Sequence, residues 1–230
     1  MSSSTSRHAA KQRIYEQFAR ISKALAAPAR LELLDLLAQG ERSVDALART
    51  TELSVANASQ HLQVLAAARL VESRRDGQRV LYRLGDETVE ALWHALQRTA
   101  EARLAELDEV ARAYLTGRDE FEPIDRGELA RRVRAGTVTL IDVRPAEEYE
   151  QAHIAGAISV PLEELPAFVE NAPKNRQVIA YCRGPYCVYA LQAVAALRKR
   201  GVRATRSDAG VSEWRAAGLP VESGNPRSQP

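Results

Sequence analysis

The sequence predicts two domains, a mainly α-helical domain followed by an α/β domain with a parallel sheet. At roughly 150 residues per domain, a chain of 230 residues corresponds to one large domain or two small ones. From about Ala9 to Leu115, apolar residues recur at helical spacing and only one hairpin pattern interrupts them. After Pro123, short β-rich runs alternate with helical stretches, which is the pattern of a parallel sheet with crossover helices.

A break in the helical pattern sets the domain boundary. Gly117 follows the last helical residue and Pro123 comes shortly after it, which is typical of a helix end followed by a linker. The expected organisation is a first domain, a linker, a second domain and two flexible tails, at residues 9–115, 116–122, 123–224, and 1–8 with 225–230.

Composition narrows the class of protein. Hydrophobic residues at 45% and charged residues at 27% are ordinary for a globular chain and exclude fibrous or wholly disordered proteins. No window approaches the ~18 apolar residues of a membrane span, and the N-terminus lacks the apolar core of a signal peptide. Two cysteines close together cannot form the disulfide framework of a secreted protein. We therefore expect a cytoplasmic protein without a membrane partner.

Two short helices in the first domain have helix-turn-helix spacing. Ser43–Thr50 forms the first, residues 51–53 the turn, and residues 54–65 the second, which Ser54 can cap. The second helix keeps apolar residues for the core and places small or hydrogen-bonding residues at its start, as a helix entering the major groove requires. The expected DNA-contacting residues are Ser54, Ala56, Asn57, Ser59, Gln60 and His61.

The net charge of +2 is too small for a globally basic nucleic-acid binder, so a local patch must supply the phosphate contacts. A predicted hairpin, with strands at 71–75 and 78–83 around an Asp76–Gly77 turn, provides one. Five arginines lie on or beside it against two acids, Glu72 and Asp76. We expect phosphate contacts from this group, chiefly from Arg74, Arg75 and Arg79.

A single helical pattern then runs from Asp86 to Leu115 with an apolar stripe. Between residues 86 and 109 it carries seven acids against two arginines, so it should point away from DNA. The stripe has no obvious partner within so small a domain. With the Ile14–Leu25 helix it is expected to form the interface of a homodimer.

Leu47–Val71 followed by the basic hairpin resembles the winged helix-turn-helix of ArsR-type bacterial repressors, over roughly Ala9–Leu115. The resemblance implies double-stranded operator DNA as partner; the alternative is a helical bundle with a chance hairpin. One departure is Arg69, where the family usually turns with Gly.

Many members of that family sense metals, but the ligands are missing here. Ser43 and Asp45 stand where the resemblance would require thiolates, and His94 has only Glu90 one turn before it. We expect no metal site and no cofactor.

In the second domain a cysteine lies between a strand and a helix. Strands are predicted at 138–143 and 177–181 and a helix at 188–199, with Cys182 and Cys187 in the connecting loop. Backbone N–H groups and the helix dipole lower the pKa of a thiol in such a loop. The resulting thiolate can attack a sulfane sulfur and hold it as a persulfide.

This half resembles the rhodanese domain over about Pro123–Glu222, through Leu140–Pro161, the Cys182 loop and Ala209–Gly224. The resemblance implies that Cys182 forms the persulfide, with Arg183 beside it and Asp142 and Arg144 in support. The alternative for Asp142 and Arg144 is a structural ion pair. The loop departs from the common pattern at Pro185, where Gly is usual, and at Cys187, where Arg is usual. These changes weaken the case for efficient thiosulfate transfer.

Cys187 leaves two interpretations open. It can attack a persulfide or an oxidised form of Cys182, or it can be a buried small hydrophobe. Three functional hypotheses follow: a repressor that senses small sulfur species such as thiosulfate or persulfide, a sulfurtransferase with an attached DNA-binding domain, and a degenerate domain that binds without chemistry. Whether the chain is an enzyme stays open at this stage.

Overall fold

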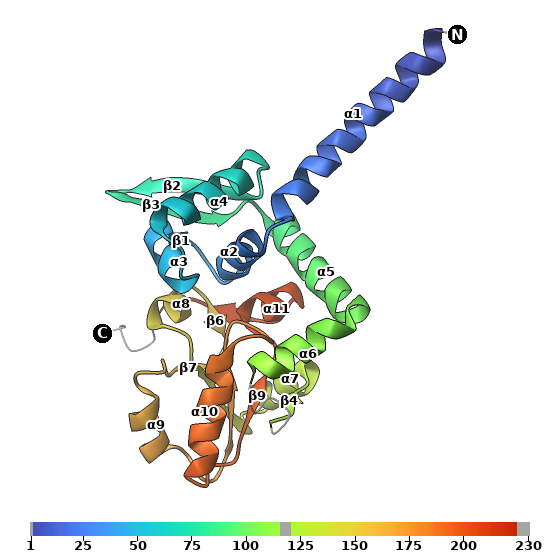
Figure 1. Cartoon of the computed structure of the whole chain (residues 1–230). Coiled ribbons are helices and arrows are strands. Elements are labelled where there is room, and N and C mark those ends of the chain that lie inside the picture. Colours follow the sequence, from blue (N-terminus) through green and yellow to red (C-terminus); the bar gives the residue numbers. More distant parts are fainter. Residues whose placement is uncertain (1, 116–120, 225–230) are drawn as a thin grey trace. The chain divides into compact units, whose positions relative to one another are not determined.

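The computed structural model describes residues 2–115 and 121–224, and the side chains from residue 7 onward (Figure 1). The chain divides into two compact units, Met1–Trp93 and His94–Pro230. The division falls within one helix, α5, so each unit contains part of it. Within the described residues, no helix is long and apolar enough to cross a bilayer.

Unit 1 is mainly helical with a small antiparallel sheet in the order β1-β3-β2. Its elements are α1 (Ser2–Leu25), α2 (Pro28–Ala38), β1 (Arg42–Ser43), α3 (Val44–Thr50), α4 (Val55–Ala67), β2 (Val71–Asp76), β3 (Arg79–Leu84) and the start of α5 (Glu87–Arg103). The apolar positions of α2, α3 and α4 form its core, because their helical spacing places them on inward faces. The largest side chains that are fully buried there are Leu33, Leu34, Leu47, Leu62 and Leu65.

Two predicted details of unit 1 and its continuation were wrong. Asp76 pairs with Arg79, so the hairpin turn is Gly77–Gln78 and not Asp76–Gly77. Gly77 takes a φ of 60°, which glycine adopts without strain. The single helix expected over 86–115 is two helices, α5 and α6 (Ala105–Tyr114). They are separated at Leu104, which is extended with φ −113° and ψ 94°. The break contains neither Gly nor Pro, so the helical spacing of apolar residues continues across it in the sequence.

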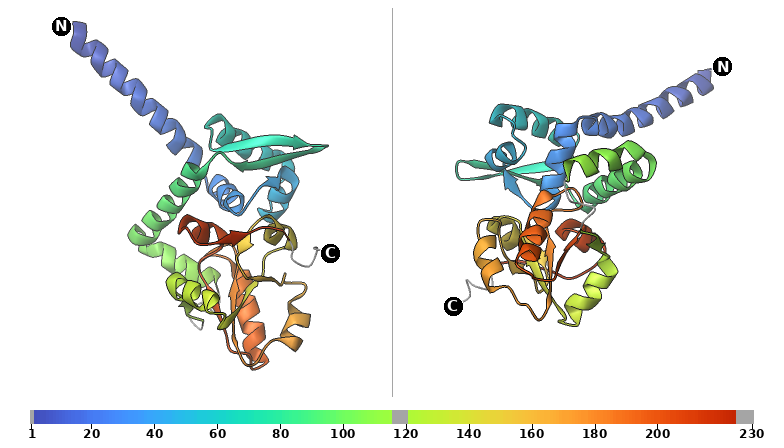
Figure 2. Two further views of the ribbon diagram at one scale, coloured as in Figure 1. Left: turned by 180° about the vertical axis from the view of Figure 1, so that it is seen from behind. Right: turned by 60° about the horizontal axis from the view of Figure 1, so that its bottom comes forward.

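The expected tails and linker fall partly outside the described residues. Residues 116–120 of the linker and the tail 225–230 are not among them. Residues 2–8, expected as a tail, belong to helix α1. Helix α1 extends from the rest of unit 1, and its residues 7–18 are all exposed (Figure 2).

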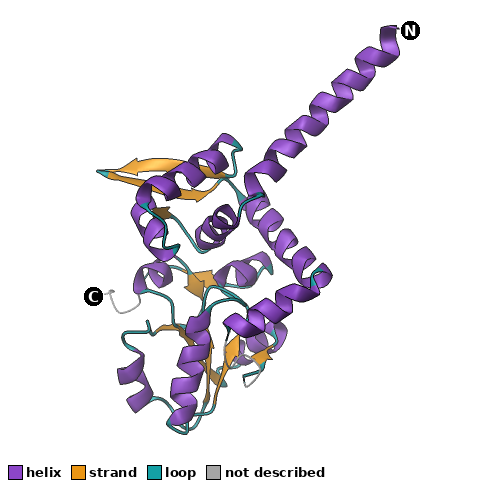
Figure 3. Cartoon of the chain, viewed as in Figure 1, coloured by secondary structure: helices purple, strands orange, loops and turns teal. Residues whose placement is uncertain are grey.

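Unit 2 contains a five-stranded parallel sheet in the order β4-β9-β8-β5-β7 (Figure 3). Besides the end of α5 and α6, its elements are β4 (Pro123–Ile124), α7 (Arg126–Arg134), β5 (Val138–Asp142), α8 (Ala146–Gln151), β6 (His153–Ile154), β7 (Ile158–Ser159), α9 (Leu165–Asn171), β8 (Gln177–Tyr181), α10 (Val188–Lys199), β9 (Ala204–Ser207), α11 (Val211–Ala216) and β10 (Val221–Glu222). The parallel sheet and the predicted span of α10 are confirmed.

Alternation along β8 explains why unit 2 has a core on each face of the sheet. Val178 and Ala180 pack with α9 and α10, and Ile179 and Tyr181 pack with α7, α8 and α11. Successive side chains of a strand point to opposite faces, and a strand covered on both faces is apolar throughout. Cys182 follows β8 directly and continues the first of these two faces.

Candidate functional site

The helix-turn-helix consists of α3, the turn at 51–53 and α4. The Ser54 hydroxyl accepts a hydrogen bond from the Asn57 N–H at 3.2 Å, and Ser43 caps α3 in the same way through Ala46. Each cap satisfies a backbone donor that the first helical turn leaves free. Both expected helices and the Ser54 cap are confirmed.

The start of α4 presents the expected DNA-contacting side chains at the surface. Ser54, Ala56, Asn57 and Gln60 are exposed, whereas Ser59 and His61 are half-buried. The opposite face of α4 carries the buried residues Ala58, Leu62 and Leu65. The helix therefore offers small and amide-bearing side chains at its N-terminal end, where close approach to base edges is possible.

The arginines of the β2–β3 hairpin differ in their surroundings. Arg74 hydrogen-bonds to the Glu41 carboxylate, with Nε at 2.9 Å from Oε1, and Arg83 pairs with Glu72 at 2.7 Å. Arg75 and Arg79 are exposed and form no ion pair within the described residues. The charges of Arg75 and Arg79 are therefore not neutralised by an ion pair, whereas that of Arg74 is partly neutralised.

The sulfur site lies at the carboxyl end of β8 in unit 2. Cys182 is 1% exposed, and Cys187 is the residue that precedes α10. Their Sγ atoms form a disulfide, and their Cα atoms are 6.2 Å apart. The disulfide encloses residues 183–186 in a short loop at the N-terminus of α10, where unpaired backbone N–H groups favour negative charge. The two cysteines were expected in one loop, and the structure joins them.

Two glycines let neighbouring chain segments approach this loop. A Cβ on Gly210 would lie 2.7 Å from the Cys182 carbonyl oxygen and 2.8 Å from the Arg183 carbonyl carbon. Gly184 has a φ of 142° and lies against the Glu213 carboxylate. The start of α11 is therefore packed directly on the backbone of the cysteine loop, an arrangement that only glycine permits.

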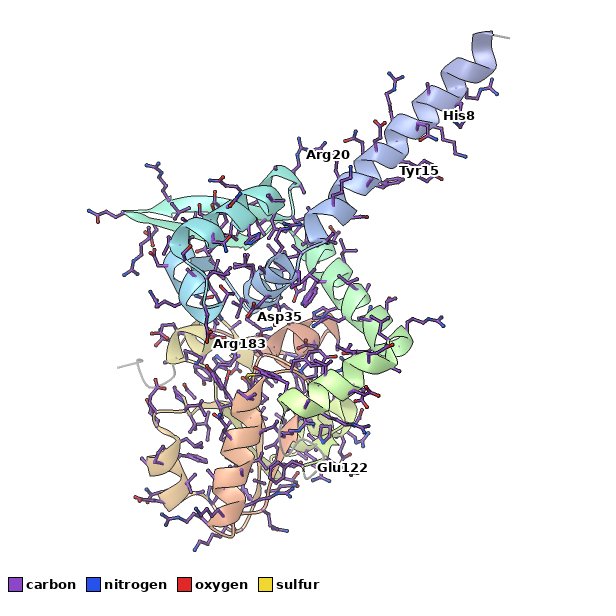
Figure 4. All side chains as sticks on the ribbon, in the orientation of Figure 1. His8, Tyr15, Arg20, Asp35, Glu122 and Arg183 are labelled. Atoms are coloured by element: carbon purple, nitrogen blue, oxygen red, sulfur yellow. A yellow bond between two sulfur atoms is a disulfide. The ribbon has the colours of Figure 1, made fainter. Side chains whose placement is uncertain are left out.

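Arg183, labelled in Figure 4, forms an ion pair with Glu148 of helix α8. Its Nε lies 3.2 and 3.1 Å from the two carboxylate oxygens of Glu148, and its Nη2 lies 2.6 Å from Oε1. Its guanidinium also lies 5.4 Å from the Tyr189 ring centroid. Burial alone would lower the pKa of Arg183, but the Glu148 hydrogen bonds outweigh it and raise the pKa. Arg183 is a permanent cation whose partner is Glu148.

Asp142 and Arg144 form a fully buried ion pair. The Arg144 guanidinium donates to both Asp142 oxygens, at 2.9 and 2.6 Å, and to the Ala152 carbonyl at 2.7 Å. The Tyr181 hydroxyl donates to Asp142 at 2.6 Å. Burial first, and then the Asp142 charge, raises the pKa of Tyr181 well above its ordinary value, so this hydroxyl keeps its proton. Through the Tyr181 hydroxyl, the carboxylate of Asp142 links the end of β5 to the end of β8, where Tyr181 immediately precedes Cys182.

The part of α5 that belongs to unit 2 contacts the region of the cysteine loop. The Tyr186 hydroxyl donates to Glu101 at 2.9 Å, and His94 Nε2 lies 2.8 Å from the Ser212 hydroxyl. His94 is 5% exposed. From the sequence, a lone histidine such as His94 is expected to be a packed or solvated residue more often than a metal ligand, but neither contact could be predicted, because no local pattern relates residues 85 and 118 positions apart.

Within the described residues, no three His, Cys, Asp or Glu side chains come close enough together to hold a metal ion.

Comparison with known proteins gives matches to both units. Residues 27–73 match the family described as bacterial regulatory protein, arsR family, and residues 125–217 match the rhodanese-like domain. The "HTH-type transcriptional regulator Rv0324" of Mycobacterium tuberculosis is 47% identical over 216 residues, which cover 94% of this chain and 95% of that protein. A "Sulfurtransferase" of Allochromatium vinosum is 34% identical over 85 residues, 36% of this chain and 78% of that protein.

Among the solved structures similar to the N-terminal region is a structure from Mycobacterium bovis. It is the solution structure of the homodimeric winged helix-turn-helix DNA-binding domain of Mb0332 from Mycobacterium bovis, with 45% identity and a TM-score of 0.40. The match covers 42% of this chain and 89% of that one.

Proposed function

Because this chain belongs to the ArsR family of DNA-binding transcriptional regulators and carries a C-terminal rhodanese-like domain, we propose that it is a homodimeric repressor that senses reactive sulfur at Cys182. In this proposal residues 9–115 bind operator DNA and dimerise, and residues 123–224 receive the signal. Ser54, Ala56, Asn57, Ser59, Gln60 and His61 approach the bases, while Arg75 and Arg79 contact phosphates more strongly than Arg74.

The observation that carries the proposal is the pairing of Cys182 with Cys187 in a loop of four intervening residues. A sulfur that can reach a second sulfur has two stable states, the dithiol and the disulfide. In a reducing cytoplasm the dithiol is the resting state, and an oxidant of sulfane-sulfur type converts it. Two cysteines that can pair therefore fit a reversible thiol–disulfide switch better than a single nucleophilic cysteine does.

The proposed reaction has two steps. The Cys182 thiolate attacks the outer sulfur of thiosulfate, the S–S bond of thiosulfate breaks, and sulfite leaves with the electron pair. Cys182 is then a persulfide. The Cys187 thiolate attacks Cys182 Sγ, hydrosulfide leaves, and the disulfide forms. Two cysteines are oxidised and one sulfane sulfur is reduced to hydrosulfide, so no other oxidant is needed. A low-molecular-weight persulfide reacts in the same way and releases its thiol.

Helix α5 offers a route by which the loop influences DNA binding. Tyr186 lies inside the loop that the disulfide closes, and it hydrogen-bonds to Glu101 of α5. In the part of α5 that belongs to unit 1, the Trp93 ring N–H donates to Asp35 of helix α2 at 3.1 Å. A change in the conformation of the cysteine loop that alters the Tyr186–Glu101 contact therefore acts on helix α5, which has residues in both units. An allosteric effect requires such an element with two arrangements.

The experiment is to measure the affinity of the full-length reduced protein for an operator duplex selected from a random library, before and after thiosulfate or glutathione persulfide. We expect a change of about tenfold, within the usual range of allosteric coupling. Cys182→Ser should show no response. Cys187→Ser should gain the mass of one sulfur atom without forming a disulfide, which separates sulfur transfer from bridge formation. Equal affinities of the wild type before and after treatment would contradict the proposal.

A sulfurtransferase is the second candidate, favoured by the similarity to the Allochromatium vinosum protein. In that case a persulfide on Cys182 passes to an acceptor thiol or to cyanide. The engagement of Arg183 by Glu148 argues against efficient repeated turnover of thiosulfate, because the Arg183 guanidinium is already bound, whereas the sensor needs thiosulfate to react only once per loop. Steady-state thiocyanate formation from thiosulfate and cyanide would favour the enzyme, and labelling of Cys182 without turnover would favour the sensor.

A further inference from the structure

The end of the unit 2 sheet opposite Cys182 carries a dense group of cations, which we call the basic edge. Strands β5, β8 and β9 begin together, since Val138 pairs with Gln177 and Val178 pairs with Ala204. The three segments that lead to these strand starts, 131–134, 174–176 and 198–203, contain nine cations and no acid. The cations of the basic edge are Arg131, Arg132, Arg134, Lys174, Arg176, Arg198, Lys199, Arg200 and Arg203.

These cations face solvent, and acids neutralise few of them. All are exposed except Arg132, which is half-buried. Glu128 pairs with Arg131 and Arg132. Within the described residues, no ion pair involves the other exposed cations Arg134, Lys174, Arg176, Lys199, Arg200 and Arg203. The basic edge therefore has a large uncompensated positive charge.

The surface between the cations is hollowed. One open depression of about 590 Å³ is lined by Glu122, Arg132, Gln177 and Arg198 among others, and a second of about 460 Å³ shares Gln177 and Arg198 and extends to Arg203. Figure 4 labels Glu122 at this end of unit 2. Arg132 donates to the Gln177 side chain at 2.8 Å, and Arg198 donates to the Ala204 carbonyl at 2.8 Å. These bonds fix two guanidinium groups at the rim.

A purely structural explanation covers only part of the group. Cations in the last turn of a helix interact favourably with its carbonyl end, which accounts for those of α7 and α10. Lys174, Arg176 and Arg203 lie in the loops that follow α9 and α10, beyond the last helical turn, where this stabilisation has fallen off. Solubility does not need nine cations in one place, and such a concentration instead attracts anions.

We propose that the basic edge binds the phosphate backbone of double-stranded DNA without reading its sequence. Seven of the nine cations are arginines, whose planar guanidinium groups bind phosphate oxygens bidentately. The described residues of the edge present no exposed aromatic side chain on which an unpaired base could stack, because Arg198 covers the Phe121 ring at 4.7 Å. A surface of this kind can contact the phosphate backbone of duplex DNA, and such contacts do not depend on the base sequence. Since the chain already binds DNA through unit 1, duplex phosphates are available to it at high local concentration.

The four lysines of the chain allow a direct test on the full-length protein. Lys174 and Lys199 belong to the basic edge, whereas Lys11 and Lys23 are exposed on helix α1. The protein is acetylated with and without a duplex of random sequence that is long enough for several copies, and each lysine is quantified by mass spectrometry. We expect DNA to slow acetylation of Lys174 and Lys199 several-fold more than that of Lys11 and Lys23. Unchanged reactivity of Lys174 and Lys199 would overturn the proposal.

A second measurement uses charge removal. In full-length protein, Arg176→Gln, Arg200→Gln and Arg203→Gln combined should lower the slope of log affinity against log salt by roughly 2–3 on random duplex. The matched control combines Arg98→Gln, Arg103→Gln and Arg126→Gln, three exposed arginines outside the edge, and should leave the slope nearly unchanged. Equal slopes for both triple variants would rule out DNA and point to an acidic protein surface as the partner. This test does not depend on Cys182, so its failure leaves the sulfur proposal standing.

Discussion

Two residues of the helix-turn-helix adopt a left-handed backbone that side chains disfavour. Glu52 has a φ of 54° and Arg69 a φ of 60°. Each lies two residues beyond the last residue of a helix. The N–H of the next residue donates to a carbonyl five residues earlier, Leu53 to Ala48 and Leu70 to Leu65, both at 3.0 Å. This is the helix-ending arrangement that glycine normally serves. The departure at Arg69 noted in the sequence is thus a position where the fold retains the glycine conformation without the glycine.

Glu52→Gly should stabilise the protein by about 0.5–1 kcal/mol, because relief of left-handed strain (~1–2 kcal/mol) exceeds the entropy cost of glycine (~0.5–1 kcal/mol).

The same residue affects the pH dependence of stability. Burial, and then the charge of Glu52, raises the pKa of Glu32. A carboxyl with a raised pKa favours the folded state when protonated, so stability falls as pH rises through the interval above its ordinary pKa. Removing Glu52 should reduce this fall.

Glu52→Ala is the matched control, since it removes the charge but keeps the strain. Chemical denaturation at several pH values should give the same reduced pH dependence for both variants and greater stability for Gly only. If Ala stabilised as much as Gly, backbone strain would not be the cause.

The contact between Gly210 and the cysteine loop gives a second prediction. Gly210→Ala places a Cβ against the Cys182 carbonyl and must displace backbone, since the nearest atom lies at 2.7 Å. We expect a loss of about 1–3 kcal/mol in stability, typical of overpacking, and a changed rate of Cys182 alkylation in the reduced protein. In Gly127→Ala the added Cβ meets the Asp125 oxygen that caps α7 at 3.1 Å, so stability should fall by no more than the loss of a cap, about 1 kcal/mol, and the rate of Cys182 alkylation should stay unchanged. Equal alkylation rates in all three proteins would show that the loop tolerates the displacement.

At the scale of elements, the N-cap residue of helix α4, Ser54, combines a structural role with a proposed role in facing DNA. Ser54 caps the helix and is exposed beside the predicted base-reading side chains. Ser54→Ala should cost about 1 kcal/mol of stability through loss of the cap. Ser54→Asp keeps a capping oxygen but adds a negative charge, so it should retain stability and weaken DNA binding. Thermal unfolding measures the capping effect and DNA titration measures the effect of the added charge. If both variants lost stability and DNA affinity in parallel, the capping role and the DNA-facing role of Ser54 would not be separable.

The hairpin predicts a ranking among its arginines. Arg75→Ala and Arg79→Ala should each lower the salt slope of DNA binding by about 1 and weaken specific and random DNA alike. Arg74→Ala should lower it less, because Glu41 already neutralises part of that charge. Glu41→Gln is the complementary variant and should raise the affinity for DNA by freeing Arg74. Three equal slopes would mean that the Arg74–Glu41 pair opens on DNA.

How far the sequence predicts these elements depends on whether local pattern or tertiary contact decides them. The Ser54 cap, the parallel strands and the span of α10 follow from local chemistry and periodicity, and all three are confirmed. The break at Leu104 carries no helix-breaking residue, so periodicity could not locate it. The same holds for the site: a loop with two cysteines is visible in the sequence, but the pairing of Arg183 with Glu148 joins residues 35 positions apart.

At the scale of the whole molecule, apolar side chains are left exposed on helices that pack little within their own unit. On α1 these are Ile14, Tyr15 and Phe18, at 56%, 57% and 62% exposure, and on α6 they include Val110 and Tyr114. Tyr15 and Phe18 stack edge to face, with ring centroids 5.9 Å apart, and so form a continuous apolar surface. Such a surface on a DNA-binding chain favours a second copy as its partner, because two recognition helices can then reach half-sites about one helical turn apart.

Phe18→Asp should therefore dissociate the proposed dimer and reduce operator affinity by at least about tenfold, since each recognition helix would bind alone. Gln12→Asp adds the same charge to an exposed polar position of the same helix and should leave both properties unchanged. Sedimentation velocity at several protein concentrations measures the oligomeric state, and DNA titration on full and half operators measures the consequence. A monomeric wild type, or a dimeric Phe18→Asp variant with wild-type affinity, would remove α1 from the interface. If Phe18→Asp instead loses helical content by circular dichroism, Ile14→Asp provides an independent change on the same surface.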